Sequence, residues 1–183
     1  MRKNSILLLI ILSIHSIGIT FCQTSKTITI SISDCIKGLD DFDYIRAELI
    51  EDGFVFSHKQ DLPNENTENG FIEYWVNLYQ QLENVNLGKP YPLFRVSIEK
   101  RPELISQTQI TISLDKEYLF DYKEKLLSEI KKLFPYRTTD SVLIKDGFEG
   151  EKTVYFLIYY RKTDNIAVSY SEQSSYNFEV YRR

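Results

Sequence analysis

The sequence predicts an α+β fold in which an antiparallel sheet carries two principal helices on one face. Several short runs alternate apolar and polar residues with a period of two, as half-buried strands do. Two longer runs place apolar residues at helical spacing and end at helix stop signals. Each helical run is followed by several strand-like runs without βαβ alternation, and this order favours antiparallel pairing.

Composition narrows the class of protein. Of 183 residues, 43% are hydrophobic and 26% are charged, which is typical of a globular domain and not of a disordered or fibrous chain. The net charge of −4 argues against a nucleic-acid partner, because nucleic-acid binders neutralise phosphates with a basic surface. Two cysteines are too few for a disulfide scaffold.

Residues 1–22 have the pattern of a secretory signal peptide. A positively charged start precedes an apolar core over residues 6–14, which is too short to cross a bilayer because a spanning helix needs about 20 apolar residues. Thr20 and Cys22 are small residues placed as a signal peptidase requires for a cut before Gln23. We therefore expect export and cleavage between Cys22 and Gln23.

Two alternatives stay open at this end of the chain. Lipidation of Cys22 would make a lipoprotein, although the bulky Phe21 departs from the small residue that lipoprotein signals place before their cysteine. An uncleaved anchor is the other alternative. With the cut before Gln23, residues 23–183 are expected to form an α+β domain in the periplasm, at the cell surface or in the medium, without a transmembrane span.

The first half of this domain is predicted to begin with a strand over residues 26–33, where isoleucines alternate with Thr and Ser. Residues 39–54 follow as a helix that Gly53 terminates, and residues 54–58 are extended.

Three further strands are predicted over residues 73–80, 93–99 and 109–114. A loop at residues 86–92, rich in Gly and Pro, separates the first two. A helix over residues 71–82 is the alternative for the first strand.

Residues 115–134 form the strongest predicted helix, with a continuous apolar stripe and Asp115 as a candidate N-cap. Three strands close the domain, over residues 153–161, 165–171 and 175–182, and a short hairpin turn joins the first two of them.

A short motif recurs in the same predicted context. Phe42-Asp43-Tyr44 returns 78 residues later as Phe120-Asp121-Tyr122, each time inside a helix that strands follow. The domain is therefore interpreted either as two similar halves, residues 23–114 and 115–183, or as one unit in which three letters coincide by chance.

The layout of a signal, a helix ending in Gly-Phe, hairpins and a second such unit resembles small secreted bacterial proteins of unassigned function, over about residues 37–183. In architecture it is also similar to tandem helix-plus-sheet proteins such as beta-lactamase inhibitor proteins and small outer-membrane assembly lipoproteins. Both resemblances rest on layout, so they imply a fold and export, and they carry over no functional residue.

Residues with nucleophilic or metal-binding chemistry are few. Cys35 and His58 are a conceivable nucleophile pair, although a lone cysteine at a strand end is usually a small buried hydrophobe. Asp40, Asp41 and Asp43 lack the spacing of a calcium loop and suit the first turn of a helix.

Paired carboxylates for hydrolysis could come from Glu73, Glu99, Asp146 and Glu149, which lie on or near predicted strands. No phosphate-binding loop or serine nucleophile motif occurs. The sequence therefore predicts no catalytic residue, no metal site and no cofactor.

Thirteen tyrosines are the unusual feature of the composition. Alternation places Tyr155 and Tyr159 on one face of their strand, and Tyr170 and Tyr181 lie in the next two strands. If helices cover one face of the sheet, the other could present these tyrosines as a contact surface, with Trp75 as an anchor. The alternative is that tyrosine is used simply as a good strand residue.

These patterns favour a non-enzymatic binding or interaction module of the bacterial cell envelope, whose partner would be an envelope protein or a glycan. A small hydrolase that uses carboxylates or the Cys35–His58 pair is one alternative. A purely structural envelope protein is the other.

Overall fold

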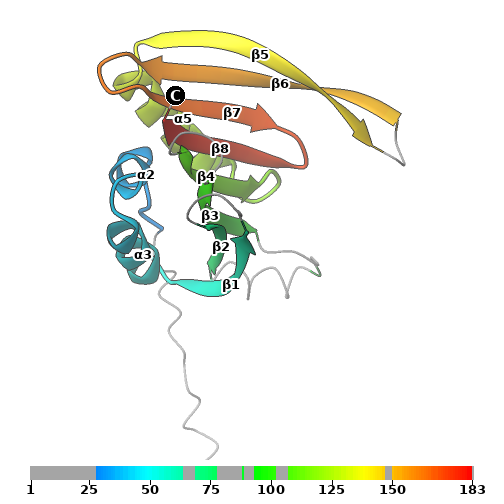
Figure 1. Cartoon of the computed structure of the whole chain (residues 1–183). Coiled ribbons are helices and arrows are strands. Elements are labelled where there is room, and N and C mark those ends of the chain that lie inside the picture. Colours follow the sequence, from blue (N-terminus) through cyan, green and yellow to red (C-terminus); the bar gives the residue numbers. More distant parts are fainter. Residues whose placement is uncertain are drawn as a thin grey trace, which may run out of the picture.

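The computed structural model contains three helices and an eight-stranded antiparallel sheet within its described residues, which confirms the α+β class (Figure 1). The structure describes residues 28–63, 69–77, 88, 93–101, 107–146 and 150–182. The helices are α2 (Ile32–Gly38), α3 (Phe42–Glu51) and α5 (Phe120–Leu133). The strands are β1 (Phe54–Leu62), β2 (Gly70–Asn77), β3 (Phe94–Arg101), β4 (Gln107–Asp115), β5 (Tyr136–Asp146), β6 (Gly150–Arg161), β7 (Ile166–Glu172) and β8 (Ser175–Arg182).

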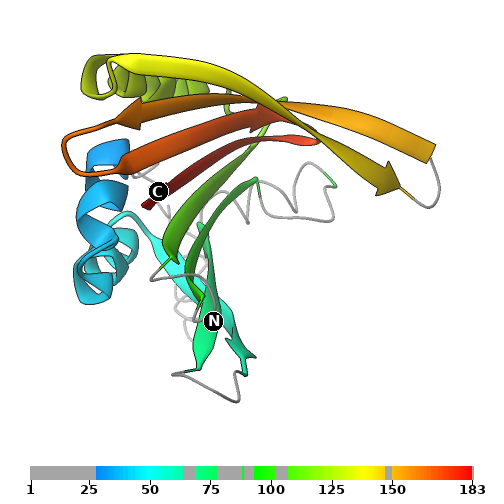
Figure 2. The same ribbon diagram turned by 45° about the horizontal axis from the view of Figure 1, so that its top comes forward.

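The sheet consists of two four-stranded meanders that meet at their last strands. The strand order is β1-β2-β3-β4-β8-β7-β6-β5, and each neighbouring pair is antiparallel. Helices α2 and α3 precede the first meander in the chain, and α5 precedes the second. Figure 2 shows that β3 and β4 curve strongly, so that β1 and β2 run at a steep angle to β5–β8.

One predicted strand is wrong. Within the strand expected over residues 26–33, the described residues 28–31 have no regular structure, and helix α2 begins at Ile32. Ser31 and Asp34 form a capping box, in which the Asp34 N–H donates to Ser31 Oγ (3.1 Å) and the Ser31 N–H donates to Asp34 Oδ2 (3.0 Å). These hydrogen bonds satisfy backbone donors at the helix start, which the alternating isoleucine pattern does not reveal.

Strand β5 and the start of α5 also differ from the sequence prediction. Strand β5 was not expected, because its first residues, Tyr-Arg-Thr-Thr-Asp, lack an apolar alternation; it pairs with β6 at the edge of the sheet. Helix α5 begins at Phe120, and Asp115 is not its N-cap. The Asp115 carboxylate instead accepts a hydrogen bond from the Glu117 N–H (2.9 Å).

The helices and the sheet share one hydrophobic core on what we call the helix-side face. Because residues directly opposite one another in the register point to the same face, a row of paired residues identifies it. One such row is Trp75, Val96, Ile112, Phe178, Tyr170 and Leu157. These side chains pack in or against the core cluster, which also contains Cys35 of α2, Leu49 of α3 and Ile130 of α5.

The other side of the sheet, which we call the opposite face, is described by three rows that each cross all eight strands. The first row is Gln60, Ile72, Glu99, Gln109, Tyr181, Ala167, Tyr160 and Tyr136. The second is His58, Tyr74, Ser97, Thr111, Glu179, Ser169, Ile158 and Thr138, and the third is Val55, Val76, Arg95, Ser113, Asn177, Ser171, Phe156 and Asp140. With strands about 4.8 Å apart, each row is about 34 Å long.

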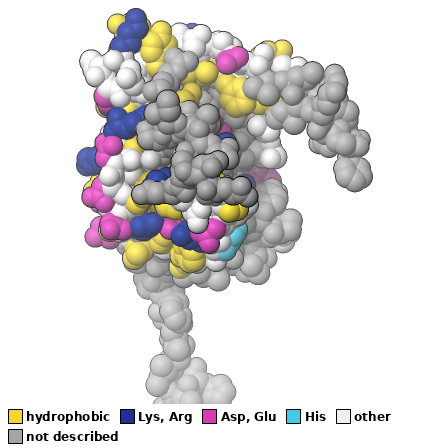
Figure 3. All heavy atoms as spheres, viewed as in Figure 1, with side chains coloured by type: hydrophobic (Ala, Val, Ile, Leu, Met, Phe, Trp, Pro, Cys, Tyr) yellow, Lys and Arg dark blue, Asp and Glu magenta, His cyan; other side chains and the backbone are white. Residues whose placement is uncertain are grey.

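The two sides of the molecule differ in their polar groups. Figure 3 shows acidic and basic side chains interspersed along the side where α2 and α3 lie, as on an ordinary solvated helix surface. The middle of the opposite face instead carries mainly hydroxyl and amide side chains, from Ser97, Thr111, Ser113, Asn177 and Ser169. The centre of the opposite face is therefore rich in hydroxyl groups and also contains the Glu99 and Glu179 carboxylates, and its β7 side chains are buried.

Candidate functional site

The tyrosine surface predicted from the sequence is not formed as one face. Tyr159 and Tyr170 are 4% and 5% exposed and belong to the helix-side core, and Trp75 is 6% exposed in the same core. The Tyr170 ring packs against Phe178, with a ring-centroid distance of 4.9 Å. Strand β6 is apolar on both of its faces, so alternation alone could not indicate which face the helices cover. These three residues fill the core and do not form a contact surface in this structure.

Tyr155 and Tyr181, the other two tyrosines predicted for this surface, lie outside the core cluster. Tyr155 points to the same face as Tyr159, but it is opposite Ser141 in a part of β6 beyond the β6–β7 pairing, which ends at Phe156 and Ser171. It is 68% exposed because the sheet there narrows to the β5–β6 ribbon, which Figure 1 shows extending past the rest of the sheet. Tyr181 is half-buried and lies in the first row of the opposite face.

The structure brings Tyr181 into a different group, which we call the tyrosine strip: Tyr136, Tyr160 and Tyr181. Ala167 separates Tyr160 from Tyr181 in the row, and its small side chain is fully buried between them. The Tyr136 and Tyr160 rings stack with centroids 5.3 Å apart and planes 20° apart. Sequence reasoning missed this group because Tyr136 lies on β5, which was not predicted.

Two glutamates lie on the opposite face near its centre. Glu99 is buried and is bonded to Arg101 on the same strand. Burial raises the pKa of Glu179 above its ordinary value of 4.5; a hydrogen bond from Ser169 Oγ (3.2 Å) opposes the rise, and the nearby Glu99 carboxylate adds to it. Of this pair, the sequence indicated only Glu99.

The raised pKa of Glu179 predicts a pH-dependent stability difference. Because the folded pKa lies above the unfolded one, the fold favours the protonated acid, and the charged form costs stability at neutral pH. We expect Glu179→Gln to be more stable than wild type at neutral pH. The difference should shrink as the pH falls through the folded pKa and vanish below about 4.5, as measured by urea unfolding of both proteins.

The control for the loss of charge is Glu51→Gln, at an exposed position at the end of α3. A stability difference between Glu179→Gln and wild type that stays constant over the whole pH range would contradict the assignment.

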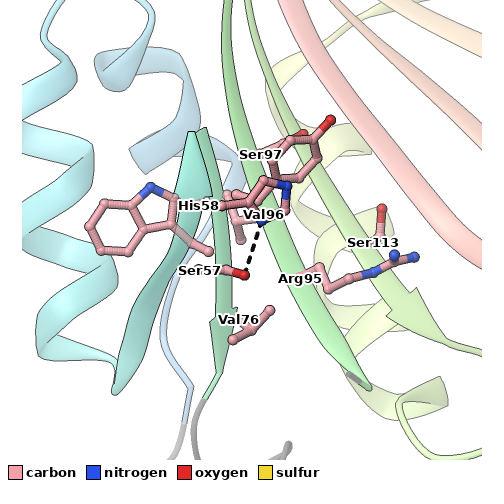
Figure 4. A pocket seen from close by; sticks show the side chains of 9 residues that line it. Ser57, His58, Val76, Arg95, Val96, Ser97 and Ser113 are labelled. Carbon is pink, nitrogen blue, oxygen red and sulfur yellow. Dashed lines mark hydrogen bonds between the residues drawn. The ribbon is translucent and has the colours of Figure 1, made fainter. Parts of the chain in front are cut away.

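A pocket of about 360 Å³ lies on the opposite face, over strands β1–β4. It is lined by Ser57, His58, Tyr74, Trp75, Val76, Arg95, Val96, Ser97 and Ser113 (Figure 4). This volume is at the lower end of the range for small-ligand pockets, which is about 300–1,000 Å³.

A β-bulge in β1 shapes the pocket wall. The register shifts between Phe56 and His58, so Ser57 is an extra residue without a partner position on β2. Ser57 Oγ lies 3.1 Å from His58 Nδ1, and Figure 4 shows this contact. The His58 ring stacks on Tyr74, with centroids 4.4 Å apart and planes 17° apart. No sequence signal indicates a bulge, so this site could not be found by motif.

The Cys35–His58 pair predicted as an alternative is not formed. Cys35 is fully buried on α2 in the helix-side core, whereas His58 is exposed on the opposite face, and the sheet lies between them. Burial also raises the pKa of the Cys35 thiol, so the reactive thiolate is disfavoured.

The other carboxylates do not gather into a site. Glu73 is on the helix-side face and holds Arg46 through two hydrogen bonds, of 3.0 and 2.7 Å. Asp41 is the N-cap of α3 and accepts from the N–H groups of Asp43 and Tyr44 (both 3.0 Å). The side chain of Asp146 and all of Glu149 lie outside the described residues.

Neither a candidate metal cluster nor a membrane-spanning helix occurs among the described residues. No group of three or more His, Cys, Asp or Glu side chains in that part of the chain is placed to hold a metal ion. None of its helices has the length and apolar character needed to cross a bilayer. In comparisons with known proteins, no family model, no curated protein and no solved structure matches this chain.

Proposed function

We propose that this protein is a non-enzymatic interaction module of the bacterial cell envelope that holds a protein partner against the opposite face of its sheet. The observation that carries the proposal is the make-up of that face. Hydroxyl and amide side chains and the carboxylates of Glu99 and Glu179 occupy its middle, the tyrosine strip lies at one end, and the stacked His58 and Tyr74 lie at the other. Aromatic residues are enriched at protein interfaces, and tyrosine beside Ser and Asn is the make-up of antibody contact surfaces.

The size of the face supports a protein partner. Each of its rows follows the sheet for about 34 Å. Accessible or partly accessible aromatic side chains lie at both ends of that length, Tyr136 and Tyr160 at one end and His58 and Tyr74 at the other. A ligand that contacts both ends has to be as large as a protein, and the small, partly accessible side chains of Ser97 and Ser113 lie between them. A glycan is the other ligand class that aromatic side chains accept, and it is an outcome that the experiment can return.

The test is affinity capture of the tagged full chain from its source cells. Tyr136→Ser/Tyr160→Ser removes two rings of the tyrosine strip, and Tyr155→Ser is the matched control at an exposed tyrosine on the other face. We expect a stoichiometric protein to co-purify with wild type and the control, and to be depleted at least about tenfold with the double variant. Retention by the double variant, or equal loss with the control, would contradict the proposal.

We further propose that the chain reaches the envelope through the signal in residues 1–22, which lie outside the described residues. The support is the charged start, the short apolar core and the small residues before Gln23. The intact mass of the native protein distinguishes a chain beginning at Gln23 from one beginning with a lipidated Cys22. A mass that includes residues 1–22 would contradict both.

We also propose that residues 23–114 and 115–183 are related halves. Both α3 and α5 begin with Phe-Asp-Tyr, and each precedes one meander of the sheet. The first half has an additional helix, α2, in its described part. Sequences of diverse relatives test the idea, since a duplication predicts that the two halves match better at the 78-residue offset than at any other.

A further inference from the structure

Arg95 is the cation of the pocket on β1–β4, and the described part of the chain provides no carboxylate that pairs with it. Arg46, Arg101, Arg161 and Arg182 each form an ion pair with an acid, whereas Arg95 and Arg137 do not do so among the described residues. Arg95 is also exposed, so an anion from outside can reach its guanidinium.

The acids nearest to Arg95 in the register are already used. Glu99, four residues further along β3, is bonded to Arg101. Asp115 lies two residues beyond Ser113 on β4, and its carboxylate accepts from the Glu117 N–H (2.9 Å). Neither forms an ion pair with Arg95, so no carboxylate of the described residues neutralises the one arginine that lines the pocket.

The remaining groups in the pocket favour a ligand in which a carboxylate is next to an aromatic or aliphatic group. Figure 4 shows the Arg95 side chain extending toward Ser113, and Ser97 lies on the same strand two residues on. Ser97 offers a hydroxyl donor on the side of Arg95, whereas the Ser113 hydroxyl already donates to Asn177 Oδ1 (2.9 Å). Val76 and the stacked rings of His58 and Tyr74 form the apolar part of the wall.

Charge decides between a carboxylate and a phosphate. A guanidinium donates two parallel hydrogen bonds to either group. A single positive charge balances a carboxylate, which carries one negative charge, but it leaves a phosphate group partly uncompensated because phosphate carries between one and two at neutral pH. The opposite face around the pocket also contains Glu99 and Glu179, which add to the cost of a second negative charge.

We propose that this pocket is a carboxylate-binding site, in which Arg95 receives the carboxylate of a protein partner and His58, Tyr74 and Val76 contact the group beside it. The inference rests on the proposed function, since the same face would hold the partner. The carboxylate comes either from a free C-terminus or from a Glu or Asp side chain.

Three capped dipeptides test the site and distinguish the sources: acetyl-Ala-Phe with a free C-terminus, acetyl-Glu-Phe-amide, and the neutral acetyl-Gln-Phe-amide. Binding is followed by NMR titration of the exported protein, through the Arg95 Nε–H and the backbone amides of Ser97 and Ser113. We expect saturable shifts with one of the two carboxylates and none with the neutral probe at the same concentration.

Arg95→Gln should weaken binding of that carboxylate by about tenfold or more, since a hydrogen bond to a charged group is lost. Arg137→Gln removes the same charge from an exposed position on the helix-side face and should leave binding unchanged. Equal shifts with the neutral probe, no saturable shift with any probe, or unchanged affinity in Arg95→Gln would overturn the inference.

Affinity capture with Arg95→Gln separates this inference from the proposed function. A partner lost with Tyr136→Ser/Tyr160→Ser but fully retained by Arg95→Gln would leave the interaction module standing and remove the carboxylate site. A carboxylate probe that binds through Arg95, with no protein captured by wild type, would support the site and contradict the module.

Discussion

Replacing Asp52 by alanine is expected to lower the free energy of unfolding by about 3 kcal/mol. Asp52 is 5% exposed and follows the last turn of α3. Its carboxylate accepts hydrogen bonds from the Thr29 N–H and Thr29 Oγ1 (both 2.7 Å) and from the buried Ile30 N–H. Alanine leaves these donors without their acceptor, and an unsatisfied buried donor costs about 1–3 kcal/mol.

Urea unfolding of the variant measures this loss. The Asp52 carbonyl, which accepts from Asn77 Nδ2 (3.0 Å), is unchanged by the substitution, so the effect reports on the carboxylate alone. Asp61→Ala is the control, because Asp61 is an exposed acid in a surface ion pair with Lys59. A loss below about 1 kcal/mol for Asp52→Ala would show that water replaces the carboxylate.

Glu129→Ala is expected to cost about 2 kcal/mol, because Glu129 of α5 caps the start of α2. Its carboxylate accepts from the Ile32 N–H (3.0 Å), the Ser33 N–H (2.9 Å) and Ser33 Oγ (2.6 Å). These contacts join residues 96 and 97 positions apart and tie the helix of the second meander to the first helix of the chain. The loss therefore affects packing between the two parts of the core as well as the helix end.

The same unfolding experiment tests Glu129, with Asp121→Ala as the control on the same helix. Asp121 is exposed in the first turn of α5, so its removal should cost under about 1 kcal/mol. Equal losses for the two variants would mean that the Glu129 contacts contribute no more than an exposed acid at a helix start.

Much of the fold could be predicted from the sequence because its periodic signals are strong. Strands β3 and β4 alternate apolar and polar residues, and α5 has a continuous apolar stripe, so both kinds of element were predicted near their observed positions. Helix α2 and strand β5 were missed for local reasons. At the start of α2, the capping box at Ser31 stabilises a helix although the residues around it alternate as in a strand. Strand β5 is stabilised by its pairing with β6, and its own composition does not favour a strand.

The candidate site was less predictable because it depends on which face the helices cover. Alternation in β6 places Tyr159 and Tyr160 on different faces of the strand, but both faces are apolar, so the sequence does not indicate which one the helices cover. The structure shows that Tyr159 lies in the core and Tyr160 in the tyrosine strip. The contact between His58 and Tyr74 depends on the bulge at Ser57, and Arg95 reaches the same pocket from a third strand. Such groupings follow from register, which a single sequence does not specify.

Site-specific photo-cross-linking in the source cells shows which face of the protein contacts the partner. A photoreactive benzoylphenylalanine replaces Thr111, in the central row of the opposite face, and in a second strain Lys131, an exposed residue of α5. We expect one defined cross-linked protein from position 111 and none from position 131. A product from position 131 with none from position 111 would contradict the proposal, since the helices and not the opposite face would then contact the partner.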